Sequence, residues 1–120
     1  VEVKELTEKL VVWLQKQKNG TPIETQVIVH DDEIAGTLDL RIDGCIADVK
    51  ATYDAGGMLH RLQLGAYAAL SQKDVDRVGI VQVTKRFKEA KWMPFDVEEC
   101  VKDWRIVRAT WALYKGNKTS

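Results

Sequence analysis

Residues 35–50 read Ala-Gly-Thr-Leu-Asp-Leu-Arg-Ile-Asp-Gly-Cys-Ile-Ala-Asp-Val-Lys, and they predict two antiparallel strands joined by a turn at Asp43-Gly44. Asp-Gly between two alternating runs is a strong signal for a two-residue hairpin, in which both turn residues take a positive φ. Alternation along the first strand places five residues on one face: Ile34, Gly36, Leu38, Leu40 and Ile42. The stretch therefore predicts a β-hairpin at the centre of a sheet.

The predicted turn also fixes which residues of the two strands face each other. Counting outward from the turn sets Asp39 directly opposite Asp48. It sets Thr37 opposite Lys50, which shares a face with Asp48. Like charges directly opposite on a sheet repel, so two carboxylates here favour a cation between them, and oxygen ligands suit Mg²⁺ or Mn²⁺. A metal with a lysine beside it fits phosphodiester hydrolysis, because the metal activates water and both cations stabilise the charged phosphate.

These residues belong to three motifs that carry a resemblance to a known family. The motifs are Gly36-Thr37-Leu38-Asp39, Asp48-Val49-Lys50 and Gln63-Leu64-Gly65-Ala66-Tyr67. In this order they resemble the PD-(D/E)XK nuclease superfamily, in its RecB-like and phage-exonuclease branch, over the stretch from Ile23 to Lys85. The resemblance implies a restriction-endonuclease-like α/β fold, with an α-β-β-β-α-β core and a mixed central sheet flanked by helices.

The resemblance also implies how a metal is held. Asp39 and Asp48 would bind Mg²⁺ or Mn²⁺, together with the backbone carbonyl of Val49. Lys50 would orient the attacking water or stabilise charge on the phosphate. Glu24 matches the glutamate that often opens the strand before the glycine–acid motif, so it is a further candidate ligand. The alternatives are aspartates on a solvated sheet face, a lysine that only neutralises them, and a surface glutamate at a strand start.

Two further groups of residues are candidates for DNA binding. Gln63 and Tyr67 lie four residues apart on a predicted helix, and the resemblance implies that they line the active site and hold the DNA strand. The alternative is a buried hydrogen-bonded pair that only positions the helix. Lys85 and Arg86 begin a basic turn after a predicted strand. Phosphate contacts are favoured there over a merely solvated turn.

One feature of the RecB-like branch has no counterpart in this sequence. Enzymes of that branch commonly carry a metal-binding histidine on an upstream helix, whereas no histidine precedes His30 here. The first predicted helix offers only Glu2, Glu5 and Glu8. Either one of these glutamates takes the place of the histidine or the corresponding helix is missing, and the sequence leaves the second metal site open.

The remaining pattern predicts the elements around the hairpin. Periodicity and turn residues predict helices over Val3–Lys18 and Met58–Gln72, strands over Glu24–His30, Arg77–Thr84 and Lys91–Phe95, a last helix after an N-cap at Asp96, and a frayed polar tail over Lys115–Ser120. Trp13, Trp104 and Trp111 fall on apolar stripes, which predicts that they are core residues and not stacking platforms for bases.

Length and composition are consistent with one globular domain over residues 1–120. The chain has 18 Lys and Arg, 18 Asp and Glu, and a formal net charge of +0, which mildly disfavours nucleic-acid binding unless basic residues cluster locally. Cys45 and Cys100 are too few for an iron–sulfur cluster, and Cys45 is predicted to be a core residue. The absence of a signal peptide and of a long apolar run predicts a cytoplasmic protein without a membrane span.

These observations together predict a Mg²⁺- or Mn²⁺-dependent deoxyribonuclease. The resemblance implies an exonuclease that resects DNA ends in phage or bacterial recombination or repair. A structure-specific or restriction-like endonuclease on the same fold is the first alternative. A catalytically silent nucleic-acid-binding module is the second, and the facing carboxylates argue against it because such a module has no need of a repulsive pair. The oligomeric state is left open, and a homo-oligomer is compatible with the sequence.

Overall fold

The computed structural model describes residues 2–17, 22–32, 34–51, 57–71 and 74–119. In chain order they form α1 (Glu2–Gln15), β1 (Ile23–His30), β2 (Ala35–Ile42), β3 (Cys45–Lys50), α2 (Met58–Leu70), β4 (Arg77–Gln82), β5 (Lys91–Phe95) and α3 (Val97–Thr119). The strands make one sheet in the order β1-β2-β3-β4-β5. Only β3 and β4 run parallel, and the other described neighbours are antiparallel. The predicted α/β class with a mixed sheet is therefore confirmed.

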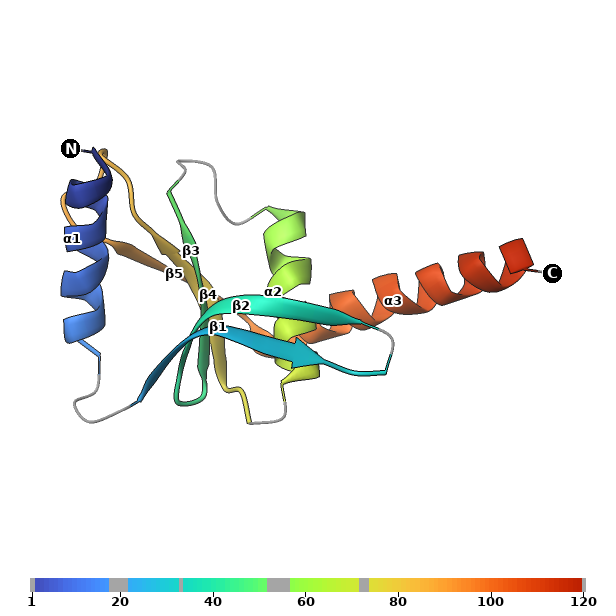
Figure 1. Cartoon of the computed structure of the whole chain (residues 1–120). Helices are drawn as coiled ribbons and strands as arrows, with labels where there is room; N and C mark the ends of the chain where they lie inside the picture. Colours follow the sequence, from blue (N-terminus) through green and yellow to red (C-terminus); the bar gives the residue numbers. More distant parts are fainter. Residues whose placement is uncertain (1, 18–21, 33, 52–56, 72–73, 120) are drawn as a thin grey trace.

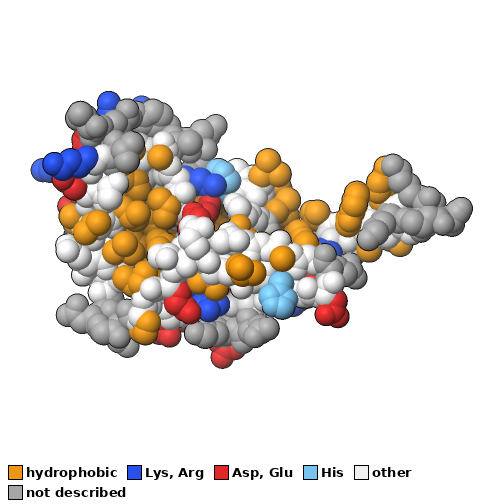
Figure 2. All heavy atoms as spheres, viewed as in Figure 1, with side chains coloured by type: hydrophobic (Ala, Val, Ile, Leu, Met, Phe, Trp, Pro, Cys, Tyr) orange, Lys and Arg blue, Asp and Glu red, His pale blue; other side chains and the backbone are white. Residues whose placement is uncertain are grey.

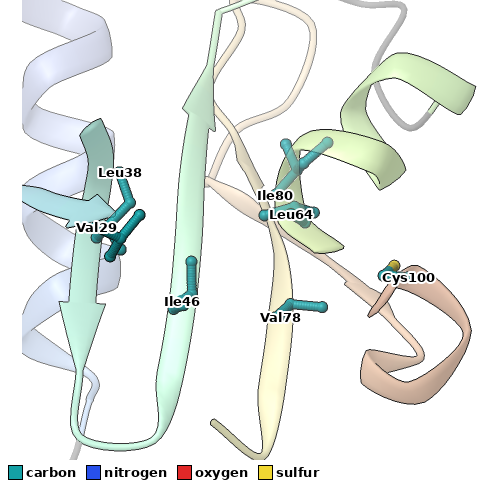
Figure 3. Packing of buried hydrophobic residues seen from close by; sticks show 7 residues of the cluster. All are labelled: Val29, Leu38, Ile46, Leu64, Val78, Ile80 and Cys100. Carbon is teal, nitrogen blue, oxygen red and sulfur yellow. The ribbon is translucent and has the colours of Figure 1, made fainter. Parts of the chain in front are cut away.

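Helices cover both faces of the sheet, with α1 on one side and α2 with α3 on the other (Figure 1). Seven buried residues form the core between the sheet and the helices α2 and α3: Val29, Leu38, Ile46, Leu64, Val78, Ile80 and Cys100 (Figure 3). A second cluster lies under α1 and consists of Leu40, Ala47, Val81 and Val83, with Leu6, Leu10, Trp13 and Leu14 of the helix packed against it. Both cysteines are buried and free, which confirms the core position predicted for Cys45. None of the helices in the described ranges is both long and apolar enough to cross a bilayer.

The central hairpin has the predicted register in its three described pairs, which lie next to the turn, but the turn itself differs. Ile42 pairs with Cys45, and Asp43 has a φ of 55°, as Asp-Gly predicts. Gly44, however, lies outside the positive-φ region. The turn therefore does not take the doubly left-handed form that Asp-Gly predicts. A Cβ atom at Gly44 would lie 2.7 Å from Oδ1 of the exposed Asp76 side chain and 3.5 Å from the carbonyl oxygen of Asp74.

A kink in the β1–β2 ribbon changes which residues share a face. Gln26 has a φ of 52°, and it stands opposite Asp39 between the pairs Thr25–Leu40 and Val27–Leu38. Beside this kink, Leu38 of β2 packs against the α2 and α3 side of the sheet, whereas Leu40 packs against α1. The prediction that all apolar residues of this strand share one face is therefore wrong, because it assumed a regular pleat along its whole length.

The last helix is longer and less covered than predicted. The prediction of a frayed polar tail from Lys115 is wrong, because α3 continues to Thr119. Trp104 is partly buried, but the side chain of Trp111 is 59% exposed, so its predicted core position is also wrong. Trp13 does occupy a packed position, stacked on Trp92 with ring centroids 5.7 Å apart.

Asp96 begins α3 as predicted, since its Oδ1 accepts a hydrogen bond from the backbone N–H of Glu99 (2.9 Å). Asp96→Ala should therefore lower the free energy of unfolding by about 1 kcal/mol, the usual contribution of an N-cap side chain. Urea denaturation measures this loss. Asp96→Ser restores an acceptor and should recover most of the stability, whereas equal losses in the two variants would contradict the capping role.

Candidate active site

The two strands of the central hairpin separate at Asp39. Their described pairs run from Ile42–Cys45 to Leu40–Ala47. Beyond them, the backbone N–H of Val49 donates to Oδ2 of Asp39 (3.0 Å), so the carboxylate takes the place of the next strand carbonyl. From this point β2 bends away with β1 (Figure 1). The expected pairing of Thr37 with Lys50 is accordingly not formed, because the described β2–β3 pairs end at Leu40–Ala47.

Asp48 lies buried where the strands separate. Its side chain alternates with that of Ala47 and points to the α2 side of the sheet, and the residue is 4% exposed, which excludes the solvated-face alternative for it. Lys50 Nζ lies 3.0 Å from Oδ2 of Asp48. That oxygen nevertheless has no well-oriented hydrogen bond within the described ranges. The pKa of Asp48 is raised to about 6, mainly by burial and also by the neighbouring Asp39, whereas Lys50 opposes the rise.

The Asp39–Asp48 pair fits a hard divalent cation. Two carboxylates held side by side at a buried position repel each other, and a divalent cation bound between them would offset that repulsion. Mg²⁺ typically binds through one or two carboxylates and keeps several waters. The described side chains contain no cluster of three or more His, Cys, Asp or Glu suited to a metal. The remaining positions around a cation at this pair would therefore be filled by water, substrate oxygens and the expected carbonyl of Val49.

The structure does not bring Glu24 to this pair. Its two carboxylate oxygens are bound by Arg41, at 2.7 Å from Nε and 3.1 Å from Nη2. The two residues are direct partners in the β1–β2 ladder, and Arg41 also donates to Ser71 at the end of α2 (3.4 Å). The structure thus gives Glu24 an ion pair that ties the hairpin to α2, and its role as a metal ligand stays a prediction.

The glutamates of the first helix also lie away from the pair. The apolar side of α1 packs on the face that carries Ala47, whereas Asp48 points to the opposite face. Glu5 lies 3.6 Å from Lys9 on its own helix. Neither Glu5 nor Glu8 can therefore replace the missing histidine in this arrangement, and the side chain of Glu2 lies outside the described residues.

Gln63 and Tyr67 of α2 do lie at the candidate site. Gln63 Nε2 donates to the Tyr67 hydroxyl (2.8 Å). The tyrosine ring lies over β2, because a Cβ atom at Gly36 would be 3.1 Å from its Cε1 atom. This contact explains the glycine of the first motif. Burial raises the pKa of Tyr67, and the carboxylates of Asp48 and Asp39 raise it further while Gln63 lowers it. The phenol therefore stays protonated at neutral pH and can act as a hydrogen-bond donor.

Lys85 and Arg86 lie in the turn that leaves the sheet beside Lys50. The backbone N–H of Val83, just after β4, donates to the carbonyl of Lys50 (2.9 Å), so the turn begins at the edge that holds the candidate site. Both basic residues are exposed. Lys9 of α1 holds this turn by donating to the backbone carbonyls at positions 84 and 87 (2.9 and 2.8 Å). Sequence reasoning missed this role of Lys9, although its place beside the apolar stripe of α1 was a signal.

Comparison with known proteins supports the fold class. No protein-family model and no curated protein matches the sequence. The structure is similar to a crystal structure titled "Crystal structure of SSO0001", with a TM-score of 0.51 and 18% sequence identity. The match covers 89% of this chain and 57% of that one, so this chain corresponds to little more than half of the longer protein. At this identity the likeness concerns the fold alone.

Proposed function

We propose that this chain is a metal-dependent deoxyribonuclease domain with a restriction-endonuclease-like fold. The observation that carries the proposal is the buried carboxylate of Asp48, which lies beside the carboxylate of Asp39 and has its Oδ2 atom 3.0 Å from Nζ of Lys50. A purely structural role accounts poorly for this arrangement, because a buried aspartate next to another carboxylate lowers stability. A site that binds a cation and a phosphate accounts for both acids and the lysine.

Each residue then has a definite task. Bound Mg²⁺ or Mn²⁺ supplies a Lewis acid that lowers the pKa of water and neutralises charge on the phosphate. Asp39 and Asp48 bind the cation. Lys50 orients the attacking water or stabilises the negative charge that develops on the phosphate. The hydroxyl group of Tyr67 donates a hydrogen bond to a phosphate oxygen. Gln63 holds the tyrosine in position through its own hydrogen bond to that hydroxyl.

DNA is the proposed partner, and exonucleolytic resection in phage or bacterial recombination or repair is the proposed role. Lys85 and Arg86 support DNA binding because they are exposed just after the end of β4, which lies beside Lys50 at the end of β3. An endonuclease on the same site is the second candidate. A silent binding module is the third, and the buried repulsive acids disfavour it.

A cleavage assay tests the proposal. The wild-type chain is incubated with linear and with covalently closed circular DNA, once in Mg²⁺ and once in Mn²⁺. An exonuclease degrades the linear form alone, whereas an endonuclease also opens the circle. Asp39→Asn is the matched control for contaminating nucleases, since it removes one candidate ligand with little change in size. If wild type binds DNA but cuts neither form with either metal, the enzyme proposal fails and the silent module replaces it.

Tyr67→Phe should reduce cleavage while hardly changing stability. The variant keeps the ring over Gly36 and loses only the hydroxyl, so the free energy of unfolding should change by about 1 kcal/mol. Cleavage per folded molecule, measured beside a urea denaturation curve, checks this expectation. A fall in stability with unchanged cleavage per folded molecule would show instead that Gln63 and Tyr67 only position the helix.

A further inference from the structure

Lys9 of α1 is hydrogen-bonded on both sides of the basic pair in residues 83–90, which we call the β4–β5 turn. Its ammonium group donates to the carbonyl oxygen of Thr84 (2.9 Å), just before Lys85. It also donates to the carbonyl oxygen of Phe87 (2.8 Å), just after Arg86. The side chain of Lys9 is 12% exposed, so both contacts are largely shielded from water. One cation therefore fixes the two carbonyl groups between which the basic side chains leave the backbone.

A groove separates α1 from the β4–β5 turn beside Lys9. It has a volume of about 360 Å³, and both elements line it, with Lys9 and Trp13 on the helix and Lys88 and Ala90 on the turn. Close packing resumes only where the turn ends, because Ala90 packs against the cluster under α1 and Trp13 stacks on Trp92. Lys9 thus spans a space that side-chain packing does not fill.

The hydrogen bonds of Lys9 are costly to lose. Thr84 is 3% exposed, so water has little access to replace the ammonium group as the partner of its carbonyl. Hydrogen bonds from a charged donor are also roughly twice as strong as neutral ones. The ion pair between Lys16 and Glu89 (3.6 Å) joins the same helix and turn through two exposed side chains, and such pairs contribute little. Lys9 is therefore the stronger of these two polar links.

The β4–β5 turn starts at the candidate site, although Lys9 lies away from it. The backbone N–H of Val83 donates to the carbonyl of Lys50 at the end of β3 (2.9 Å). The helix that carries Lys9 packs on the face of the sheet opposite Asp48. Basic side chains are visible in Figure 2 at the upper left, where α1 lies in Figure 1. An effect of Lys9 on a substrate at the candidate site has to pass through the turn.

We infer that Lys9 is a positioning residue for DNA, which holds the β4–β5 turn so that Lys85 and Arg86 face the phosphates of a strand bound at the candidate site. The inference rests on the proposed function, because the two basic residues need a phosphate chain as their ligand. It gives α1 a part in substrate binding, although the glutamates of that helix lie away from the Asp39–Asp48 pair. The alternative is that Lys9 only ties α1 to the rest of the fold.

Lys9→Met keeps the aliphatic part of the side chain and removes the ammonium group. It should weaken binding of a fluorescein-labelled duplex in Ca²⁺ about 10-fold, and it should reduce the slope of log affinity against log salt by about 1–2. In Mg²⁺, KM should rise with kcat nearly unchanged, because Asp39, Asp48 and Lys50 keep their positions. Lys4→Met is the matched control, since it removes an exposed lysine from the same helix, and it should leave both quantities near the wild-type values.

A double-mutant cycle shows whether Lys9 acts through the turn. Replacing both Lys85 and Arg86 with glutamine should reduce the salt slope by about 1.8, twice the value for one duplex phosphate. In that background Lys9→Met should hardly change the affinity further, because the residues that it positions are gone. If Lys9→Met does not fold, Lys9→Gln takes its place, since glutamine keeps a donor for one of the two carbonyls. Circular dichroism gives the folded fraction by which each affinity is corrected.

Three outcomes would overturn the inference. The first is a lower melting temperature of Lys9→Met with unchanged affinity per folded molecule, which would make Lys9 a structural tether alone. The second is an equal loss of affinity with and without Lys85 and Arg86, which would mean that the charge of Lys9 acts on DNA directly. The third is a wild type that does not bind DNA.

The proposed function fails separately from this inference. If DNA binding depends on Lys9 through the turn but neither Mg²⁺ nor Mn²⁺ supports cleavage, the positioning role stands and the nuclease does not. If DNA is cut but Lys9→Met binds it with normal affinity, the nuclease stands and the positioning role does not.

Discussion

Replacing Lys50 with alanine should slow DNA cleavage in Mg²⁺ by about 10²–10³-fold, the usual effect of removing one electrostatic contact to a transition state. Lys50 lies 3.0 Å from Asp48, at the point where β2 separates from β3. Its ammonium group is therefore held where negative charge develops on a phosphate bound beside the Asp39–Asp48 pair. Binding of the same duplex in Ca²⁺ should change little, because one phosphate contact among several supplies a small part of the affinity.

The loss of Lys50 also removes the charge partner of a buried acid, so cleavage has to be measured per folded molecule. Arg is the informative second substitution at position 50, since it keeps a positive charge but changes its geometry, and intermediate activity is expected. Lys4→Ala is the matched control, because it removes an exposed lysine of α1. Near-normal cleavage by Lys50→Ala would exclude the catalytic role and leave the lysine as an ion-pair partner alone.

The central hairpin was predictable because its signals are local. Asp43-Gly44 sets the register of the pairs from Ile42–Cys45 to Leu40–Ala47, and Asp39 and Asp48 lie next to each other just beyond them. The kink at Gln26 was not predictable, because a non-glycine residue with a φ of 52° carries no signature in the pattern of apolar residues. Opposite that kink, Leu38 and Leu40 of β2 pack on different faces of the sheet, which the pattern also did not predict.

The candidate site was predictable where residues lie close in sequence and failed where a partner was overlooked. Spacing alone placed Gln63 and Tyr67 on one side of a helix, and the structure joins them by a hydrogen bond. Glu24 was assigned to the metal because the resemblance implies a glutamate at that strand start, and its ion pair with the strand partner Arg41 was not foreseen. Periodicity likewise placed Trp111 on the packing side of α3, but periodicity cannot tell how far along α3 the contact with α2 extends.

Asp48→Asn should stabilise the metal-free protein above pH 6. The pKa of Asp48 is raised from 3.8 to about 6 in the folded protein, mainly by burial. Between these two pH values the native state holds more protons than the unfolded state, so stability falls as the pH rises. Above pH 6 the full penalty is present, and two pKa units correspond to about 3 kcal/mol as an order of magnitude. Asparagine carries no charge and removes this penalty.

The difference in melting temperature between Asp48→Asn and wild type therefore should be near zero at pH 4, should grow up to pH 6 and should then level off at several degrees. Added Mg²⁺ should raise the melting temperature of the wild type above pH 6, because it binds the ionised pair. It should leave the melting temperature of Asp48→Asn almost unchanged. Asp43→Asn is the matched control, because it removes an exposed acid from the same hairpin. A variant that is no more stable than wild type at pH 8 would show that Asp48 is not a strained buried acid. An undiminished response to Mg²⁺ in Asp48→Asn would show that the cation binds elsewhere.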